Sequence, residues 1–184
     1  MKKLALTLAL TAFAGLVSAG SVTLEGQDQL GDKGAKNSTN YQVSVKESIN
    51  NTFAGDVRFI NYQQHQTEAL STDLEAGVTG TYPVGSAGIY ARVALGERYT
   101  NTGNFAYYSI EPGVTYTLGK ATAKVGYRYR TAMVDPNVYN NTTDTVRVGL
   151  SYALTKKDTV GVRYDRMRGD IQNHSYNMSY TRSF

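Results

Sequence analysis

Residues suited to acid–base or nucleophilic chemistry are few in this chain. Among the 184 residues there are two histidines, His65 and His174, and no cysteine. His174 and Ser175 are adjacent, so on a strand they would point to opposite faces and could not form a base–nucleophile pair. His65 near Asp73 is a poor substitute for the acid and base of a protease. Two separated histidines also argue against a metal site. We therefore expect no enzyme, no metal and no cofactor.

Basic residues, in contrast, recur at a regular spacing. The segments 121–131, 143–153 and 159–168 together carry five basic residues on their polar face against one acidic residue, Asp165. The five are Lys124, Arg128, Arg130, Arg147 and Arg163, and a sixth basic candidate, Arg92, lies upstream. If these segments are neighbouring strands about 4.8 Å apart, the side chains form a ladder of like charge. Such a ladder is unfavourable unless acids across the structure, or an anionic guest, neutralise it. One interpretation is a pore wall that guides anions, and the other is a salt-bridged core.

The elements that would position these residues alternate with a period of two. Between 106 and 118 every second residue is apolar or aromatic and the residues between them are mostly polar, which predicts a strand with one apolar face. The pattern recurs at 125–129, 146–154, 160–164 and 176–184, and more weakly at 22–24, 41–45, 57–59, 74–78 and 89–95.

Short and long connections alternate between these segments. Tight turns are predicted at 49–52, 83–86, 118–120 and 155–158, and longer loops near 30–40, 63–70, 99–104, 133–142 and 168–173. That order is typical of an up-and-down barrel. We expect an all-β, antiparallel transmembrane barrel of about ten strands over 20–184, with eight or twelve as alternatives. An even number places both termini on the periplasmic side.

The apolar face of these strands is rich in tyrosine near its ends, which favours contact with lipid over a soluble core. After the N-terminus no apolar run approaches the ~18 residues of a membrane helix. Residues 1–19 have the basic, apolar and small-residue regions of a signal peptide. Removing them leaves 17 Lys and Arg against 15 acids, near +2, which excludes a strongly basic nucleic-acid binder.

Glycines form a second pattern on the polar face. One falls on each of six successive predicted strands: Gly77, Gly96, Gly113, Gly126, Gly149 and Gly161. Glycine weakens a strand, so it calls for a reason such as sharp curvature or the close approach of another group. Relief of crowding in a small barrel is one interpretation. A lumen kept open at those heights is the other.

The C-terminal segment is similar to the terminal strand of Gram-negative outer-membrane barrels. Its alternating residues are Tyr176, Met178, Tyr180 and the closing Phe184, with a departure at Arg182. The resemblance implies that the barrel-assembly machinery recognises this strand. It also implies insertion among outer-membrane lipids and lipopolysaccharide after export.

The stretches 108–116 and 124–130 resemble, in style, the oligogalacturonate-specific (KdgM-type) monomeric porins, which have twelve strands. That resemblance implies passage of small anionic solutes such as acidic oligosaccharides along basic tracks. We therefore expect a monomeric outer-membrane channel whose anion pathway includes the six basic residues above. The alternative is a side-chain-filled barrel with a structural or adhesin-like role and no conducting pore.

Overall fold

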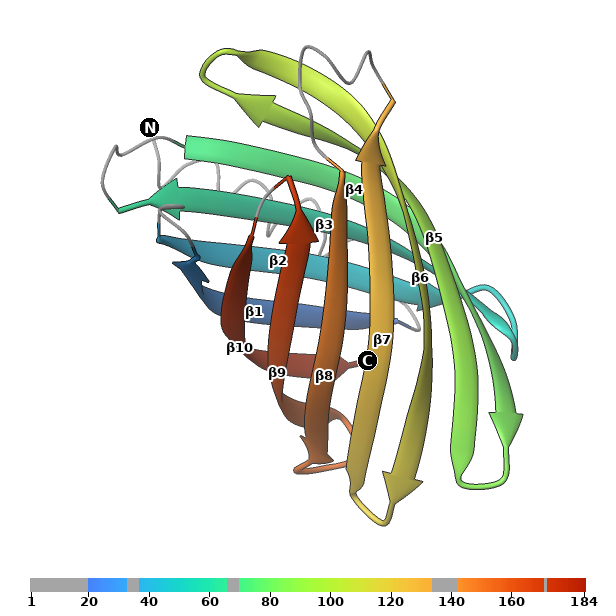
Figure 1. Ribbon diagram of the computed structural model, residues 1–184. Coiled ribbons are helices and arrows are strands. Elements are labelled where there is room, and N and C mark those ends of the chain that lie inside the picture. The colour runs from blue at the N-terminus through green and yellow to red at the C-terminus, as the bar shows by residue number, and fades with distance from the viewer. Residues whose placement is uncertain (1–19, 33–36, 66–69, 134–141, 171) are drawn as a thin grey trace.

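The protein forms one closed β-barrel. The computed structural model describes residues 20–32, 37–65, 70–133, 142–170 and 172–184. Ten antiparallel strands in these ranges close on themselves, which confirms the predicted architecture at ten strands (Figure 1). The strands are β1 (Ser21–Gly31), β2 (Ser38–Ser48), β3 (Phe53–Gln64), β4 (Leu70–Val84), β5 (Ala87–Thr100), β6 (Gly103–Leu118), β7 (Ala121–Ala132), β8 (Thr143–Ala153), β9 (Asp158–Gly169) and β10 (Asn173–Ser183). The predicted signal peptide lies outside the described residues.

Each strand pairs with its neighbour in sequence, and β1 pairs with β10 to close the barrel. Ser21 lies opposite Ser183, and the Phe184 amide donates to the Gly20 carbonyl at 3.0 Å. We call the end that holds the connections 49–52, 85–86, 119–120 and 154–157, with the start of β1 and the end of β10, the turn end. The opposite end is the loop end.

One predicted loop is wrong. Residues 99–104 were expected to form a longer polar loop, but β5 continues to Thr100 and β6 begins at Gly103, so only Asn101 and Thr102 connect them. Gly103 adopts φ 146°, and the Thr100 hydroxyl donates to its carbonyl at 2.8 Å. A positive φ at glycine and a local side-chain bond let polar residues make a tight turn where composition alone predicts a loop.

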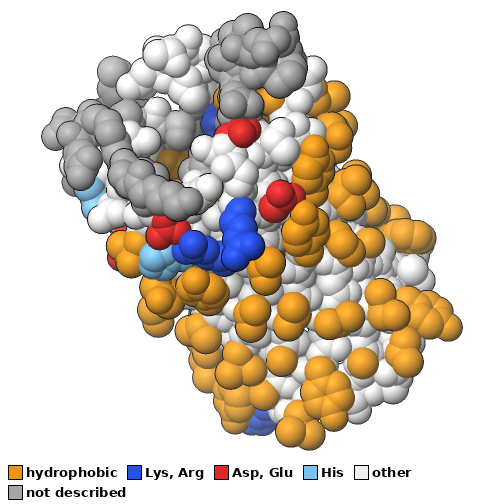
Figure 2. Space-filling model, in the orientation of Figure 1, with side chains coloured by type: hydrophobic (Ala, Val, Ile, Leu, Met, Phe, Trp, Pro, Cys, Tyr) orange, Lys and Arg blue, Asp and Glu red, His pale blue; other side chains and the backbone are white. Residues whose placement is uncertain are grey.

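Alternation along the strands places apolar side chains on the outside and charged ones inside. Leu74, Val93 and Val125 are exposed on the outer surface, whereas Glu75 and Arg92 are buried in the lumen. Figure 2 shows the outward hydrophobic side chains as a broad belt over the lower part of the face. A protein that folds in water does not expose a continuous apolar belt over a charged interior, so this belt requires hydrocarbon as its solvent. The described residues form no helix that is long and apolar enough to cross a bilayer.

Val93, in the middle of the outward face of β5, tests whether the apolar face of the barrel contacts lipid. Val93→Arg should lower the free energy of unfolding by about 2–4 kcal/mol, as measured by urea titration in phospholipid vesicles, because a cation at the bilayer midplane is costly. Ser44→Arg, inward on β2, is the matched control and should cost much less. Equal losses for the two variants would contradict that contact.

Candidate functional site

The centre of the lumen is organised around a buried carboxylate, Glu75 of β4. Its side chain has no exposed surface, and it accepts from Arg92 of β5 at 2.7 Å and from Arg128 of β7. A guanidinium nitrogen of Arg58 lies 3.9 Å away. Arg128 reaches across from a strand that is three positions from β4 in the barrel, so the contact crosses the lumen. A charge this deeply buried requires such partners because it has lost its water.

A second carboxylate, Asp56 of β3, continues this central cluster toward the turn end. Arg92 binds it with two parallel bonds, Nε at 2.9 Å and Nη2 at 2.6 Å, and Arg58 adds a bond at 3.0 Å. The planar guanidinium fork matches both carboxylate oxygens. Arg92 therefore joins two acids from neighbouring strands and is itself buried. Its role in the structure is to hold the wall of the lumen together.

The loop end of the lumen holds a separate cluster around Asp73 of β4. Arg98 donates to both oxygens at 2.6 Å, and Arg130 lies at 3.6 Å. The hydroxyls of Tyr62 and Tyr107 also donate to this carboxylate, at 3.3 and 3.5 Å. The two arginines stack on those same rings, since Arg98 lies 4.9 Å from the Tyr62 centroid and Arg130 lies 5.3 Å from that of Tyr107. Aromatic and ionic groups thus fill this part of the lumen together.

A third set of ion pairs crosses the lumen at mid-height. Arg147 of β8 donates to Glu111 of β6 at 2.6 Å and approaches Asp165 at 3.8 Å. Arg163 of β9 reaches Glu25 of β1 with two bonds at 2.9 and 3.0 Å and also donates to Asp165 at 2.8 Å. These contacts join β6, β8, β9 and β1.

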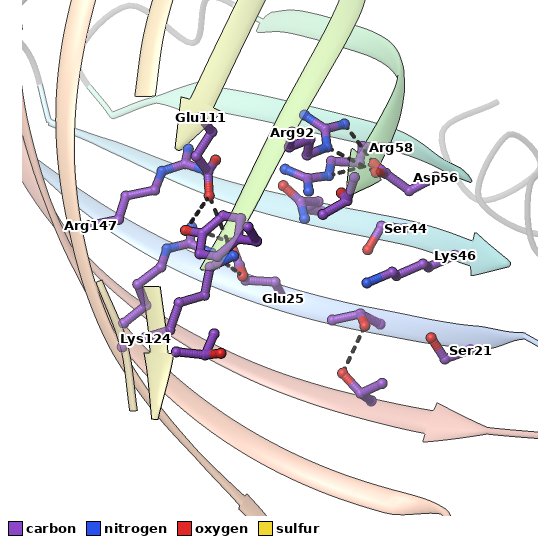
Figure 3. Close-up of a pocket in the computed structure, with 18 of the residues that line it drawn as sticks. Ser21, Glu25, Ser44, Lys46, Asp56, Arg58, Arg92, Glu111, Lys124 and Arg147 are labelled. Carbon is purple, nitrogen blue, oxygen red and sulfur yellow. Dashed lines mark hydrogen bonds and ion pairs between the residues drawn. The ribbon is translucent and has the colours of Figure 1, made fainter. Parts of the chain in front are cut away.

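A vestibule of about 470 Å³ opens at the turn end (Figure 3). Lys46 and Lys124 point into it, and Lys124 lies 4.1 Å from the Tyr90 ring centroid. The charged surface that the vestibule exposes is positive. Side-chain exposure is 46% for Lys124, 26% for Arg163 and 20% for Arg58, and Lys46 is also exposed. The acids of the same wall are 8% exposed or less: Glu25, Asp56 and Glu111.

The loop half of the lumen is much narrower, with a cavity of about 40 Å³. Four side chains line both this cavity and the vestibule, and they define the constriction between them: Glu25, Gln42, Arg147 and Arg163. Beyond the constriction the interior is packed with polar and apolar side chains that are almost fully buried, among them Asn40, Ile60, Phe105, Thr143, Thr145 and Ser175.

The inward glycines give room to large side chains. A Cβ added to Gly113 would collide with the Tyr90 ring, one on Gly126 with the Tyr90 hydroxyl, and one on Gly96 with Tyr107. A Cβ on Gly77 would lie 2.6 Å from a guanidinium nitrogen of Arg92. The remaining two glycines abut Arg163 and Ser179. At five of the six positions, all but Gly149, the added Cβ would lie closer than 3.0 Å to another side chain, so the geometry favours relief of crowding over a lumen held open.

All six predicted basic residues face the lumen, but the expected ladder is neutralised by acids. Arg92, Arg128, Arg130 and Arg147 are mostly buried in ion pairs, and Arg163 and Lys124 are the two that remain accessible in the vestibule. No role in the lumen was predicted for the inward rings of Tyr62, Tyr90 and Tyr107. Each of these tyrosines is an even number of residues from an inward charged residue of the same strand. That spacing was the signal that could have revealed them.

The residues of the predicted assembly signal lie on β10, the strand that closes the barrel. Tyr176, Met178 and Tyr180 are exposed on the outer face, and Phe184 follows the end of the strand. Recognition of this strand by the assembly machinery stays a prediction.

The described residues do not bring catalytic pairs together around either histidine. Ser175 is buried in the lumen, whereas His174 points outward, as the alternation requires. His65 shares a bond of 2.7 Å with the Thr39 hydroxyl. In the described part of the chain, no three His, Asp or Glu side chains are grouped to hold a metal ion.

No protein-family model matches the sequence, and no curated protein matches it. Solved structures do match the fold. The NanC porin superposes with a TM-score of 0.57 at 13% identity, covering 89% of this chain and all of the porin. The β-domain of the Bordetella autotransporter BrkA gives 0.54 at 13% identity, covering 90% of this chain and 99% of that domain. This chain has the fold of the outer-membrane β-barrels.

A third outer-membrane barrel extends the comparison to the whole chain. The translocator domain of the autotransporter NalP from Neisseria meningitidis gives a TM-score of 0.50 at 9% identity, covering 100% of this chain and 95% of that domain. Porins and translocator domains share this architecture, so the choice between a channel and another role depends on the lumen of this chain.

We predict that Glu75 is the most sensitive charged position in the lumen. Glu75→Gln should lower the free energy of unfolding by about 3 kcal/mol, because it leaves buried arginines without their shared counter-charge. Urea unfolding in vesicles measures the loss. Glu47→Gln, at the exposed end of β2, is the control and should change stability little. If the two substitutions had the same effect, the central cluster would not stabilise the barrel.

Proposed function

We propose that this barrel lies in the outer membrane with its turn end toward the periplasm and acts as a narrow channel that favours anions. The observation that carries the proposal is the layering of charge in the vestibule, where accessible lysines and arginines cover buried carboxylates. An ion entering from the turn end meets positive charge first. A narrow lumen with low-dielectric walls concentrates that field and raises the local concentration of anions.

The balance of charge in the whole lumen supports the same preference. Among the described residues, nine basic side chains face inward against six acidic ones, an excess of three: the bases are Lys46, Arg58, Arg92, Arg98, Lys124, Arg128, Arg130, Arg147 and Arg163, and the acids are Glu25, Asp56, Asp73, Glu75, Glu111 and Asp165. Lys46 has no ion pair within 4 Å among the described residues, so its charge is available to a solute.

The opposite wall suggests which anions would fit. The inward faces of β10, β1 and β2 carry mainly amides and hydroxyls around Glu25 and Lys46, among them Gln27, Gln42, Ser44 and Thr181. A solute with hydroxyls on one side and carboxylates on the other would match both walls, because hydroxyls and amides exchange hydrogen bonds and guanidinium groups bind carboxylates. Small acidic sugars have that chemistry. We propose them as the solute class, for a monomeric protein without catalytic activity.

A second candidate function rests on the loop half of the lumen. The cavity of about 40 Å³ and the buried side chains around it favour a filled barrel with a structural or surface-interaction role. The two candidates differ in one measurable property, the passage of ions. The purified barrel in a planar bilayer should give single-channel steps. In a KCl gradient, their reversal potential should lie closer to the equilibrium potential of chloride than to that of potassium. Absence of steps would reject the channel in favour of the filled barrel, and cation selectivity would reject the anion preference.

We predict that the vestibule lysines set the selectivity. The double variant Lys46→Gln, Lys124→Gln should shift the reversal potential toward cations. A unit charge at about 4 Å changes the energy of an ion in water by about 1 kcal/mol, so each lysine contributes up to roughly fivefold to anion partitioning. Lys120→Gln, on the tight turn between β6 and β7, is the control. An unchanged reversal potential in the double variant would show that these lysines do not face the ion path.

We also predict that the contact between Glu25 and Arg163 limits conductance. Removing both side chains in Glu25→Ser, Arg163→Ser widens the constriction and leaves Asp165 with Arg147 as its partner. Single-channel conductance should rise at least about twofold, in line with a wider pore. Thr23→Ala, on the same face of β1 toward the turn end, serves as the control. Equal conductance in all three proteins would place the limiting step elsewhere.

A further inference from the structure

A group of charged side chains lies on the outer surface of β9 and β10, at the loop-end margin of the apolar belt. Arg166, Arg168 and His174 point outward there, as their parity with Val162 and Tyr164 requires. The carboxylate of Asp32, just past β1, forms an ion pair with Arg166 at 2.5 Å, and its other oxygen lies 3.4 Å from Nδ1 of His174. Figure 2 shows basic, acidic and histidine side chains at the upper margin of the hydrophobic belt. Lumen chemistry does not account for this group, because it faces away from the lumen.

The free positive charge of this group is on Arg168. It is exposed and forms no ion pair within 4 Å with a described carboxylate. Its cross-strand neighbour Asp144 instead accepts the Tyr127 hydroxyl at 2.5 Å. Asp28 of β1 also faces outward, opposite Tyr176, so it brings negative charge to the other side of the group. An anion would therefore contact Arg168 first, and Arg166 only through the guanidinium nitrogens that do not bind Asp32.

Directly below the charges the belt has an apolar groove of about 520 Å³. Tyr164 and Tyr176 line it together with Val148, Leu150, Val162 and Met178. The same two tyrosine rings pack against His174, with centroids 6.3 and 6.1 Å away. Residues two apart on a strand are separated by about 6.6 Å, so Arg166 lies one such step above Tyr164. The groove and the charged group are therefore parts of one continuous surface.

A second, larger groove of about 990 Å³ lies on the other side of Met178. Its floor includes Gly26, outward on β1, and its walls include Tyr41 and Phe59. Gly26 is paired with Tyr41 on one side and Met178 on the other, so a missing side chain between two large ones creates the hollow. Met178 is 72% exposed and forms the ridge between the two grooves.

We propose that this surface binds one molecule of a phosphorylated, multiply acylated lipid of the leaflet at the loop end. Its phosphate contacts Arg168 and Arg166, and its acyl chains lie in the two grooves on either side of Met178. The exposed guanidinium of Arg168, which has no ion pair with a described carboxylate, selects the phosphate. Its continuity with the apolar grooves selects a lipid over a soluble phosphate. The proposal needs the loop end to face a leaflet that contains such lipids, and it does not depend on whether the lumen conducts.

Native mass spectrometry of the purified barrel with added lipid tests this. The probe is hexa-acylated lipid A with two phosphates, and the comparisons are the same lipid without phosphates and inorganic phosphate alone. Arg166→Gln, Arg168→Gln should weaken binding of the phosphorylated lipid about tenfold and leave the dephosphorylated lipid unchanged, since charge-assisted hydrogen bonds to phosphate are lost. Arg182→Gln, an outward arginine at the turn end, is the control and should bind as the parent does. Equal affinity of the parent for both lipids, or an unchanged affinity in the double variant, would overturn the proposal.

Two further variants separate headgroup from acyl recognition. Asp28→Asn should strengthen binding, because it removes the nearby negative charge. Gly26→Leu should weaken it by filling the larger groove, and it should fold normally, because nothing lies within 4 Å of a Cβ at that position. Each variant is checked for the parent's conductance and heat-modifiable gel mobility. Binding of inorganic phosphate that falls in parallel with lipid in the arginine variants, with no effect of Gly26→Leu, would identify a phosphate site and reject the lipid.

Discussion

The barrel depends on the neutralisation of carboxylates that its strands carry into the lumen. Each of the six inward acids contacts an arginine of another strand, and Glu75 contacts three. Because a buried acid without its partner is strongly unfavourable, these contacts fix how the walls of the barrel approach one another. The outer belt requires only that apolar residues meet hydrocarbon. The ion pairs are more selective, since they specify which residue meets which.

The same contacts explain why the lumen is uneven. The charged clusters occupy the walls from β3 to β9, and the tyrosines and glycines interlock among them, as Tyr90 does over Gly113 and Gly126. The walls of β10, β1 and β2 are left with mostly uncharged amides and hydroxyls. Space remains in the vestibule at the turn end, and there the accessible charged groups are cationic. The proposed preference for anions therefore rests on where the acids are buried, as well as on the excess of bases.

The outer surface has an organisation of its own that is independent of the lumen. Successive residues of one strand alternate between the two sides, so β9 contributes Arg163 to the constriction and Arg166 to the outer charged group. A strand can thus take part in solute passage and in lipid contact with separate residues. This division is what allows the two proposals to be tested by different substitutions.

The sequence by itself determined where most strands lie and which side each residue faces, because alternation with a period of two is a local property of the backbone. It predicted about ten strands and left eight or twelve open, and closure of the barrel at ten decided the number. It placed Arg128 and Arg147 inside and Tyr176 and Met178 outside. It mistook 99–104 for a loop, because composition does not reveal a glycine at positive φ. Tertiary structure alone decided that Arg128 meets Glu75 and that Arg163 meets Glu25. Those partners are 53 and 138 residues apart in sequence, and their meeting depends on the radius and stagger of the closed barrel, which no local pattern records.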